Sequence, residues 1–198
     1  MKVVIIGGVA GGATAAARIR RLDERAEIIM LERTGYGSYA NCGLPYYVGG
    51  EIEDEEELTL QTPASFFARY RVDVRVLSEA LAIDRKNKTV TVKNLKTGET
   101  YEETYDKLLL SPGARAVIPP AARVKDTRVF TMRTVEDALA IHACVEKTAP
   151  KDAVVVGGGF IGLETAENLM RKGVRVTLIQ LDSQVMPPFD SDMAALLH

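Results

Sequence analysis

Near its start the chain reads Lys2-Val3-Val4-Ile5-Ile6-Gly7-Gly8-Val9-Ala10-Gly11-Gly12, a β-branched strand that runs straight into a glycine-rich turn. Residues 13–22 follow as an alanine- and arginine-rich helical segment. A strand, a glycine turn and a helix in this order aim backbone N–H groups and the positive end of the helix dipole at a pyrophosphate. This stretch therefore predicts an α/β fold that begins with a dinucleotide-binding turn.

The next predicted strand, residues 26–31, leads into an acid. Glu32 follows Gly12 by about 20 residues, the spacing at which an acid accepts hydrogen bonds from a ribose diol. Val9 stands where the fingerprint has its second glycine, so a purely structural βαβ turn is the alternative. The strand, the helix and Glu32 together favour dinucleotide binding. The residues assigned to this site are Gly7, Gly8, Val9, Ala10, Gly11, Gly12, Glu32 and Arg33.

A second unit of the same design starts at residue 151, and here all three fingerprint positions are glycine. Its second strand, residues 174–179, ends before Gln180. An acid at that place favours NAD and a nearby arginine favours NADP, so Gln180 leaves the choice open, with a lean to NADH. Two such turns predict two dinucleotides, and a duplicated motif without ligands is the alternative. The residues assigned to the second site are Gly157, Gly159, Phe160, Ile161, Gly162, Glu164 and Gln180.

One cysteine, Cys42, lies between the two turns and is followed by Gly43-Leu44-Pro45. This pattern is typical of a loop-to-helix junction, where backbone N–H groups and the helix dipole stabilise a thiolate. No second cysteine lies within a few residues, so the oxidised form would be a mixed disulfide, a persulfide or a sulfenic acid. An inert buried cysteine is the alternative. We interpret Cys42 as a redox centre.

Between the turns the sequence alternates apolar and polar residues in short runs, at 74–77, 82–84, 89–92 and 99–103, which suggests an antiparallel meander. A buried strand at 108–110 then returns to the first sheet and places Gly113 near its ligand-binding edge. Residues 119–122 have the composition of a linker. Two dinucleotide turns in one chain are the arrangement of a flavoenzyme that is reduced by a nicotinamide. The predicted domains are therefore residues 1–116 for FAD and residues 117–198 for the nicotinamide cofactor.

Composition excludes some classes of function. The net charge of −2 gives no support for a nucleic-acid partner, and no apolar run is long enough to predict a membrane span. The two histidines, His142 and His198, have no neighbouring ligands, so no metal site is expected. Cys144 lies among apolar residues at helical spacing and is expected to be a small buried hydrophobe. These features predict a cytoplasmic protein.

The first turn, the segment 38–50, the runs Leu60-Gln61-Thr62-Pro63 and Leu110-Ser111-Pro112-Gly113-Ala114, and the second turn together resemble the coenzyme A disulfide reductases. These form the single-cysteine branch of the FAD-dependent pyridine nucleotide-disulfide oxidoreductases, and some are fused to a rhodanese domain and reduce persulfides. The resemblance covers essentially the whole chain. It implies two Rossmann-like domains with parallel sheets, the first carrying the meander.

The resemblance also implies FAD and NADH or NADPH as cofactors, and coenzyme A as the thiol partner. Cys42 would be the redox nucleophile, with Asn41 and Ser38 lining the thiol site. Thr14, Arg18 and Arg21 share one helical face and would meet the coenzyme A phosphates or pantetheine arm, although arginines there could equally be solvated surface. The parent would be a homodimer that acts on a small disulfide or persulfide, and the chain would be a truncated part of it.

Two alternatives stay open. Related NADH oxidases and peroxidases carry a histidine in the first glycine turn, at a place that here is Ala10, and this favours the coenzyme A branch. An NADH oxidase or peroxidase that cycles Cys42 through a sulfenic acid is the rival enzyme. A truncated non-catalytic nucleotide-binding module, or a redox sensor that uses Cys42, is the rival from another class.

Overall fold

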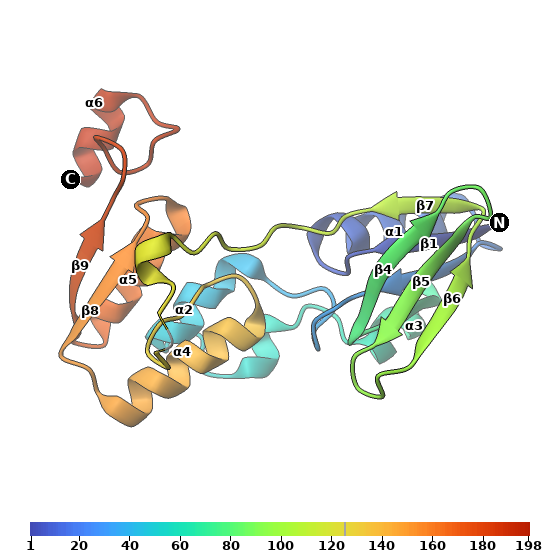
Figure 1. Cartoon of the computed structure of the whole chain (residues 1–198), viewed down its shortest axis with the longest axis horizontal. Coiled ribbons are helices and arrows are strands. Elements are labelled where there is room, and N and C mark those ends of the chain that lie inside the picture. Colours follow the sequence, from blue (N-terminus) through green and yellow to red (C-terminus); the bar gives the residue numbers. More distant parts are fainter. Residues whose placement is uncertain (125) are drawn as a thin grey trace. The chain divides into compact units, whose positions relative to one another are not determined.

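The computed structural model describes residues 1–124 and 126–198, and these form two compact units (Figure 1). The first unit combines Met1–Tyr39 with Thr59–Arg115, and the second combines Ala40–Leu58 with Ala116–His198. The segment that carries Cys42 is thus grouped with the C-terminal residues. The functional division at residues 116 and 117 stays a prediction.

The first unit is built on a parallel sheet with strand order β3-β2-β1-β7. Ile6 at the end of β1 pairs with Leu31 of β2 and Leu110 of β7. Ala13 and Ala16 of α1 and Phe66 of α3 pack with the buried β-branched residues of these strands. The elements are β1 (Lys2–Ile6), α1 (Ala10–Leu22), β2 (Glu27–Leu31), α3 (Pro63–Tyr70), β3 (Val72–Arg75) and β7 (Lys107–Leu110).

A three-stranded antiparallel meander packs against a second group of side chains from the parallel sheet. Its strands are β4 (Ser78–Asp84), β5 (Thr89–Asn94) and β6 (Thr100–Thr104). Val90 and Val92 alternate inward on β5 and form a core with Val4, Ile29 and Leu31. The run at 74–77 was expected in the meander, but residues 72–75 instead form the parallel edge strand β3. Alternation alone could not reveal which sheet this strand joins.

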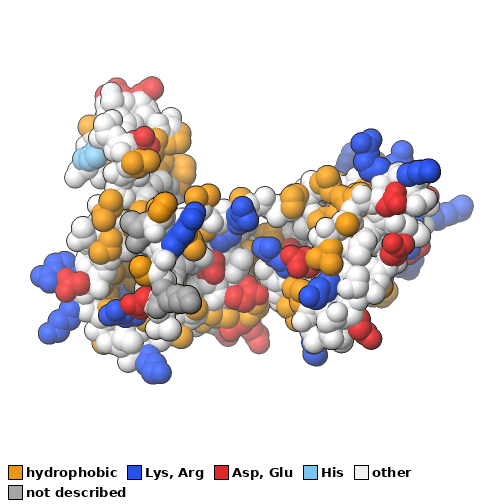
Figure 2. Space-filling view, viewed as in Figure 1, with side chains coloured by type: hydrophobic (Ala, Val, Ile, Leu, Met, Phe, Trp, Pro, Cys, Tyr) orange, Lys and Arg blue, Asp and Glu red, His pale blue; other side chains and the backbone are white. Residues whose placement is uncertain are grey.

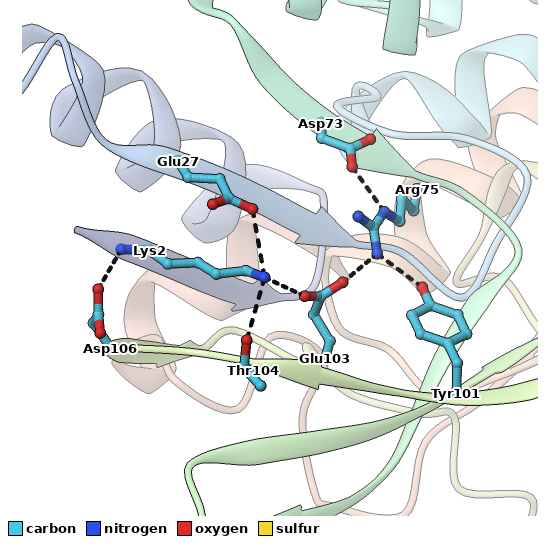
Figure 3. Close-up of polar contacts among 8 residues, drawn as sticks. All are labelled: Lys2, Glu27, Asp73, Arg75, Tyr101, Glu103, Thr104 and Asp106. Atoms are coloured by element: carbon cyan, nitrogen blue, oxygen red, sulfur yellow. Dashed lines mark hydrogen bonds and ion pairs between the residues drawn. The ribbon is translucent and has the colours of Figure 1, made fainter.

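A polar network also holds the meander to the parallel sheet, and Figure 3 shows Lys2 and Arg75 pointing toward Glu103 from two sides. The Glu103 carboxylate on β6 is 2.5 Å from Lys2 Nζ on β1 and 2.5 Å from an Arg75 nitrogen on β3. Arg75 also donates to Tyr101 Oη at 3.1 Å. Burial raises the pKa of Glu103, but the hydrogen bonds and charges of Lys2 and Arg75 outweigh burial and hold it below its usual value.

The second unit contains a parallel strand pair, and its helix α5 packs on both strands. The short helix α2 contacts α4 and α5. Cys144 on α4 is half-buried, less covered than expected, because its face of the helix is partly open. The elements are α2 (Leu44–Gly49), α4 (Val135–Thr148), β8 (Asp152–Val156), α5 (Phe160–Arg171), β9 (Arg175–Ile179) and α6 (Ser191–Ala194).

The two parallel sheets and the antiparallel meander confirm the predicted fold class. On the face shown in Figure 2, acidic and basic side chains are interspersed, in keeping with the net charge of −2. Within residues 1–124 and 126–198, none of the helices combines the length and the apolar character needed to cross a membrane.

We expect Glu103→Gln to lower the free energy of unfolding at neutral pH by about 1–3 kcal/mol, because two cations lose their shared carboxylate. Since the folded pKa of Glu103 is depressed, its contribution is present above the unfolded pKa and is lost as the pH falls through the folded pKa. The variant should therefore lose less stability than the wild type on acidification, measured by urea unfolding. Glu102→Gln, at the exposed neighbouring position on β6, is the control. Equal effects of the two changes would contradict the assigned role of Glu103.

Candidate functional site

The first glycine turn depends on glycine at its entry. Gly7 has φ of +103°, a conformation that side chains other than glycine rarely adopt. A Cβ at Gly7 would also collide with the Ser111 carbonyl from the loop after β7. Val9, the departure from the fingerprint, has φ of −96°, so its backbone does not require glycine. The turn therefore keeps its conformation with valine at position 9.

The helix that follows the turn has an open N-terminus. Val9 is the N-cap of α1 and makes no side-chain capping bond, and the first turn of the helix holds no acid. Uncapped N–H groups and the helix dipole together attract an anion such as a pyrophosphate. The predicted positions Ala10, Gly11 and Gly12 form this first helical turn. The arrangement has the chemistry of a phosphate cradle.

Glu32 is held rigidly at the end of β2, and its exposed fraction is only 7%. Its Oε2 accepts a hydrogen bond from the Gly8 N–H at 2.8 Å. Its Oε1 accepts from the N–H and the hydroxyl of Thr34, at 2.8 and 2.9 Å. The carboxylate therefore ties the glycine turn to the neighbouring strand.

A groove runs along the carboxyl end of the parallel sheet, the edge at which ligands of open α/β sheets bind. It brings together four of the predicted residues: Gly7, Glu32, Arg33 and Gly113. Sequence reasoning missed the start of β4, residues 78–80, which also lines the groove. The start of β4 is held beside the end of β2, because the Ser78 N–H donates to the Glu32 carbonyl at 2.8 Å. Only the fold reveals that contact.

The second turn repeats the first with an amide in place of the acid. Gly157 has φ of +109°, and α5 begins after Gly159 without a side-chain cap. The Gly158 N–H donates to Gln180 Oε1 at 2.7 Å, as the Gly8 N–H does to Glu32. Gln180 Nε2 then donates to Asp182 Oδ2 at 3.2 Å. Asp182 was not predicted, and its place three residues beyond β9 is the only signal for it in the sequence.

The other residues predicted for the second site lie on α5. Phe160 and Ile161 are largely exposed at the start of the helix, and Gly162 and Glu164 follow within its first turns. The backbone N–H groups of this uncapped start are therefore flanked by apolar side chains rather than by acids.

The residues predicted for the thiol site belong to different units. Ser38 lies in the first unit, where its N–H donates to the Gly8 carbonyl at 2.8 Å. Asn41 and Cys42 lie in the second unit, in the 3-10 turn Asn41–Gly43 that leads into α2. The Cys42 side chain is exposed and forms no disulfide. The junction predicted from sequence is present, but α2 has only 6 residues, so its dipole is a weak source of positive potential.

Asn41 has a partner that sequence reasoning did not find. Its Oδ1 accepts a hydrogen bond from Arg133, at 3.1 Å, from the segment just before α4. On α1, in the first unit, the three residues predicted to meet coenzyme A are all exposed: Thr14, Arg18 and Arg21. Their roles as ligand contacts stay predictions.

Comparisons with known proteins agree with this architecture. The family model described as pyridine nucleotide-disulphide oxidoreductase matches residues 1–198. The chain is 42% identical over 192 residues to the coenzyme A disulfide reductase of Staphylococcus epidermidis, an alignment that covers 97% of the chain and 43% of that protein. The chain thus spans less than half the length of this curated relative.

Two solved structures are similar over the full chain. The reduced Bacillus anthracis protein CoADR-RHD is 49% identical with a TM-score of 0.93, and the chain covers 36% of it. An NAD-dependent persulfide reductase from A. fulgidus is 38% identical with a TM-score of 0.92, and the chain covers 37% of it.

Substitutions at two glycines of the second turn should distinguish an effect on folding from an effect on ligand binding. Gly157→Ala should lower the free energy of unfolding by about 1–3 kcal/mol, because its φ is strained for alanine. Gly159→Ala should leave stability within about 0.5 kcal/mol, because its φ is −85° and no atom lies within 4 Å of an added Cβ. Gly159→Ala should nevertheless weaken NADH binding about tenfold, because the new methyl obstructs the approach of a pyrophosphate. Unfolding curves and calorimetric NADH titrations test both; unchanged NADH affinity in Gly159→Ala would refute a dinucleotide site here.

Proposed function

Because the chain belongs to the pyridine nucleotide-disulphide oxidoreductase family, we propose that its whole protein passes electrons from NADH or NADPH through FAD to Cys42. Cys42 would then reduce coenzyme A disulfide or a related small disulfide or persulfide. The observation that carries this proposal is the presence of two glycine turns, each with an uncapped helix start, in one chain with an exposed thiol at a turn-helix junction. The names of the relatives support the substrate class.

The residues of the first unit fit FAD. Open N–H groups at the start of α1 suit its pyrophosphate, and the fixed Glu32 carboxylate suits its adenosine ribose. The groove at the sheet edge offers the space beside them. When bound, the flavin supplies two-electron redox chemistry between a nicotinamide and a thiol.

The role of the chain's own residues centres on the sulfur of Cys42. Its thiolate attacks one sulfur of coenzyme A disulfide, so that a Cys42–coenzyme A disulfide forms and one coenzyme A thiolate leaves. Two electrons from NAD(P)H and one proton then cleave this mixed disulfide, which restores the Cys42 thiolate and releases the second coenzyme A as a thiol. Arg18 and Arg21 would bind the phosphates of coenzyme A, since both are exposed cations on α1.

On the nicotinamide side the site favours NADH. The Gly158 N–H fixes the Gln180 amide so that its NH₂ group faces the Asp182 carboxylate. Neutral ribose hydroxyls can donate to this carboxylate, whereas the 2′-phosphate of NADPH would be repelled by it. The residues from Gln180 to Gln184 contain no cation that could offset this repulsion.

We expect the chain to bind NADH more tightly than NADPH, and Asp182→Asn to reduce the difference by about 3- to 10-fold, chiefly by improving NADPH binding. Fluorescence titration of both nucleotides measures this ratio. Asp190→Asn makes the same charge change at another exposed acid of the second unit and should leave the ratio unchanged. Equal ratios in the wild type and Asp182→Asn would contradict the assignment.

The thiol chemistry is tested by incubating the chain with coenzyme A disulfide and measuring its intact mass with and without a reducing agent. We expect one reducible coenzyme A adduct, mapped by peptide analysis to Cys42 and absent in Cys42→Ser. An adduct only on the half-buried Cys144, or none, would overturn the proposal. A sulfenic acid formed on Cys42 by peroxide, without any coenzyme A adduct, would favour the NADH oxidase or peroxidase alternative.

The cytoplasmic location and the homodimeric state of the whole protein stay proposals. A reducing compartment suits an enzyme that returns small disulfides to thiols.

A further inference from the structure

An arginine far from Cys42 in the chain contacts the residue beside it. Arg133 donates to Asn41 Oδ1 at 3.1 Å across a separation of 92 residues, in a partly buried contact within the second unit. The proposed thiol chemistry uses no cation next to Cys42. The contact with Asn41 places a guanidinium on the residue that precedes Cys42.

The position of Arg133 is set by the start of α4. Asp137 Oδ2 accepts hydrogen bonds from the Arg133 N–H at 2.8 Å and from the Thr134 N–H at 3.2 Å. The Thr131 hydroxyl donates to the same oxygen at 3.3 Å. Thr134 and Asp137 also form a capping box. One carboxylate thus fixes the backbone from which the guanidinium extends.

The Cys42 segment meets α4 at a second point. The Tyr47 ring lies 4.8 Å from the His142 ring, and His142 Nδ1 is 3.1 Å from the Tyr47 carbonyl. Because Asn41 contacts Arg133 just before α4, and Tyr47 contacts His142 on α4, the Cys42 turn is flanked by contacts on both sides. The guanidinium therefore has a defined place relative to this turn.

A positive charge near the Cys42 sulfur would have a chemical role. Disulfide exchange at Cys42 passes through thiolate sulfur, which a nearby positive charge favours. The dipole of α2 offers little positive potential there, because the helix has only 6 residues. Arg133 is permanently charged, and its bond to Oδ1 orients the Asn41 amide so that the NH₂ group is on the opposite side.

We propose that Arg133 is a positioning residue for Cys42: it fixes the Asn41 amide and holds a positive charge beside the redox sulfur, which favours anionic sulfur species there. This inference rests on the proposed function, in which a thiolate leaves when Cys42 attacks a disulfide. The charge would stabilise both the Cys42 thiolate and the departing thiolate.

The test uses alkylation of Cys42 in the whole chain by anionic iodoacetate and by neutral iodoacetamide, followed by peptide mass analysis so that Cys144 is counted separately. Arg133→Gln should lower the iodoacetate-to-iodoacetamide rate ratio at Cys42 about 2- to 5-fold, because an attracting charge is lost. Arg133→Lys should keep most of the wild-type ratio. Arg133→Met, which preserves the aliphatic stem, replaces Arg133→Gln if the amide variant does not fold.

Arg128→Gln is the matched control, because it removes an exposed arginine of the second unit that pairs with Asp126. It should leave the ratio at Cys42 unchanged. An unchanged ratio in folded Arg133→Gln or Arg133→Met, or an equal loss in Arg133→Lys, would overturn the proposal. Since the readout needs no disulfide turnover, a changed ratio without any coenzyme A adduct on Cys42 would refute the proposed function while keeping the role of Arg133.

Discussion

In each glycine turn, one hydrogen bond ties the second glycine to the side chain that ends the neighbouring strand. The Gly8 N–H reaches Glu32, and the Gly158 N–H reaches Gln180. This bond consumes one backbone donor and leaves those at the helix start uncapped, so the turn is rigid and still open to an anion. Rigid turns at the carboxyl ends of parallel strands are what place the groove and the proposed nucleotide contacts.

The same bond gives the two turns different chemistry. A carboxylate at Glu32 is anchored by three donors from Gly8 and Thr34 and lines the groove. The amide oxygen of Gln180 accepts from the Gly158 N–H, and its NH₂ group donates to the Asp182 carboxylate. The negative charge is thus displaced by two residues in the second site. In the proposed function the shared backbone design would hold two dinucleotides, and the side chain at one position would decide which contacts each ribose meets.

Polar contacts that join distant segments also hold the elements around these sites. Glu103 couples the meander to the parallel sheet through Lys2 and Arg75, and Asp137 holds the segment from which Arg133 reaches Asn41. In both places a carboxylate collects several donors, which repays the cost of removing it from water. The Cys42 segment is contacted by Arg133, which follows Asn41 by 92 residues and lies just before α4.

The sequence by itself determined the two glycine turns, the parallel strands and helices around them, the meander after residue 78, the junction at Cys42 and the family. These depend on local properties: β-branched runs, glycine at positive φ, and helix starts. Only the tertiary structure decided that residues 72–75 join the parallel sheet, that the start of β4 lines the groove, that Asp182 meets Gln180 and that Arg133 meets Asn41. Such contacts arise from chain crossovers and side-chain directions, which leave no periodic trace in the sequence.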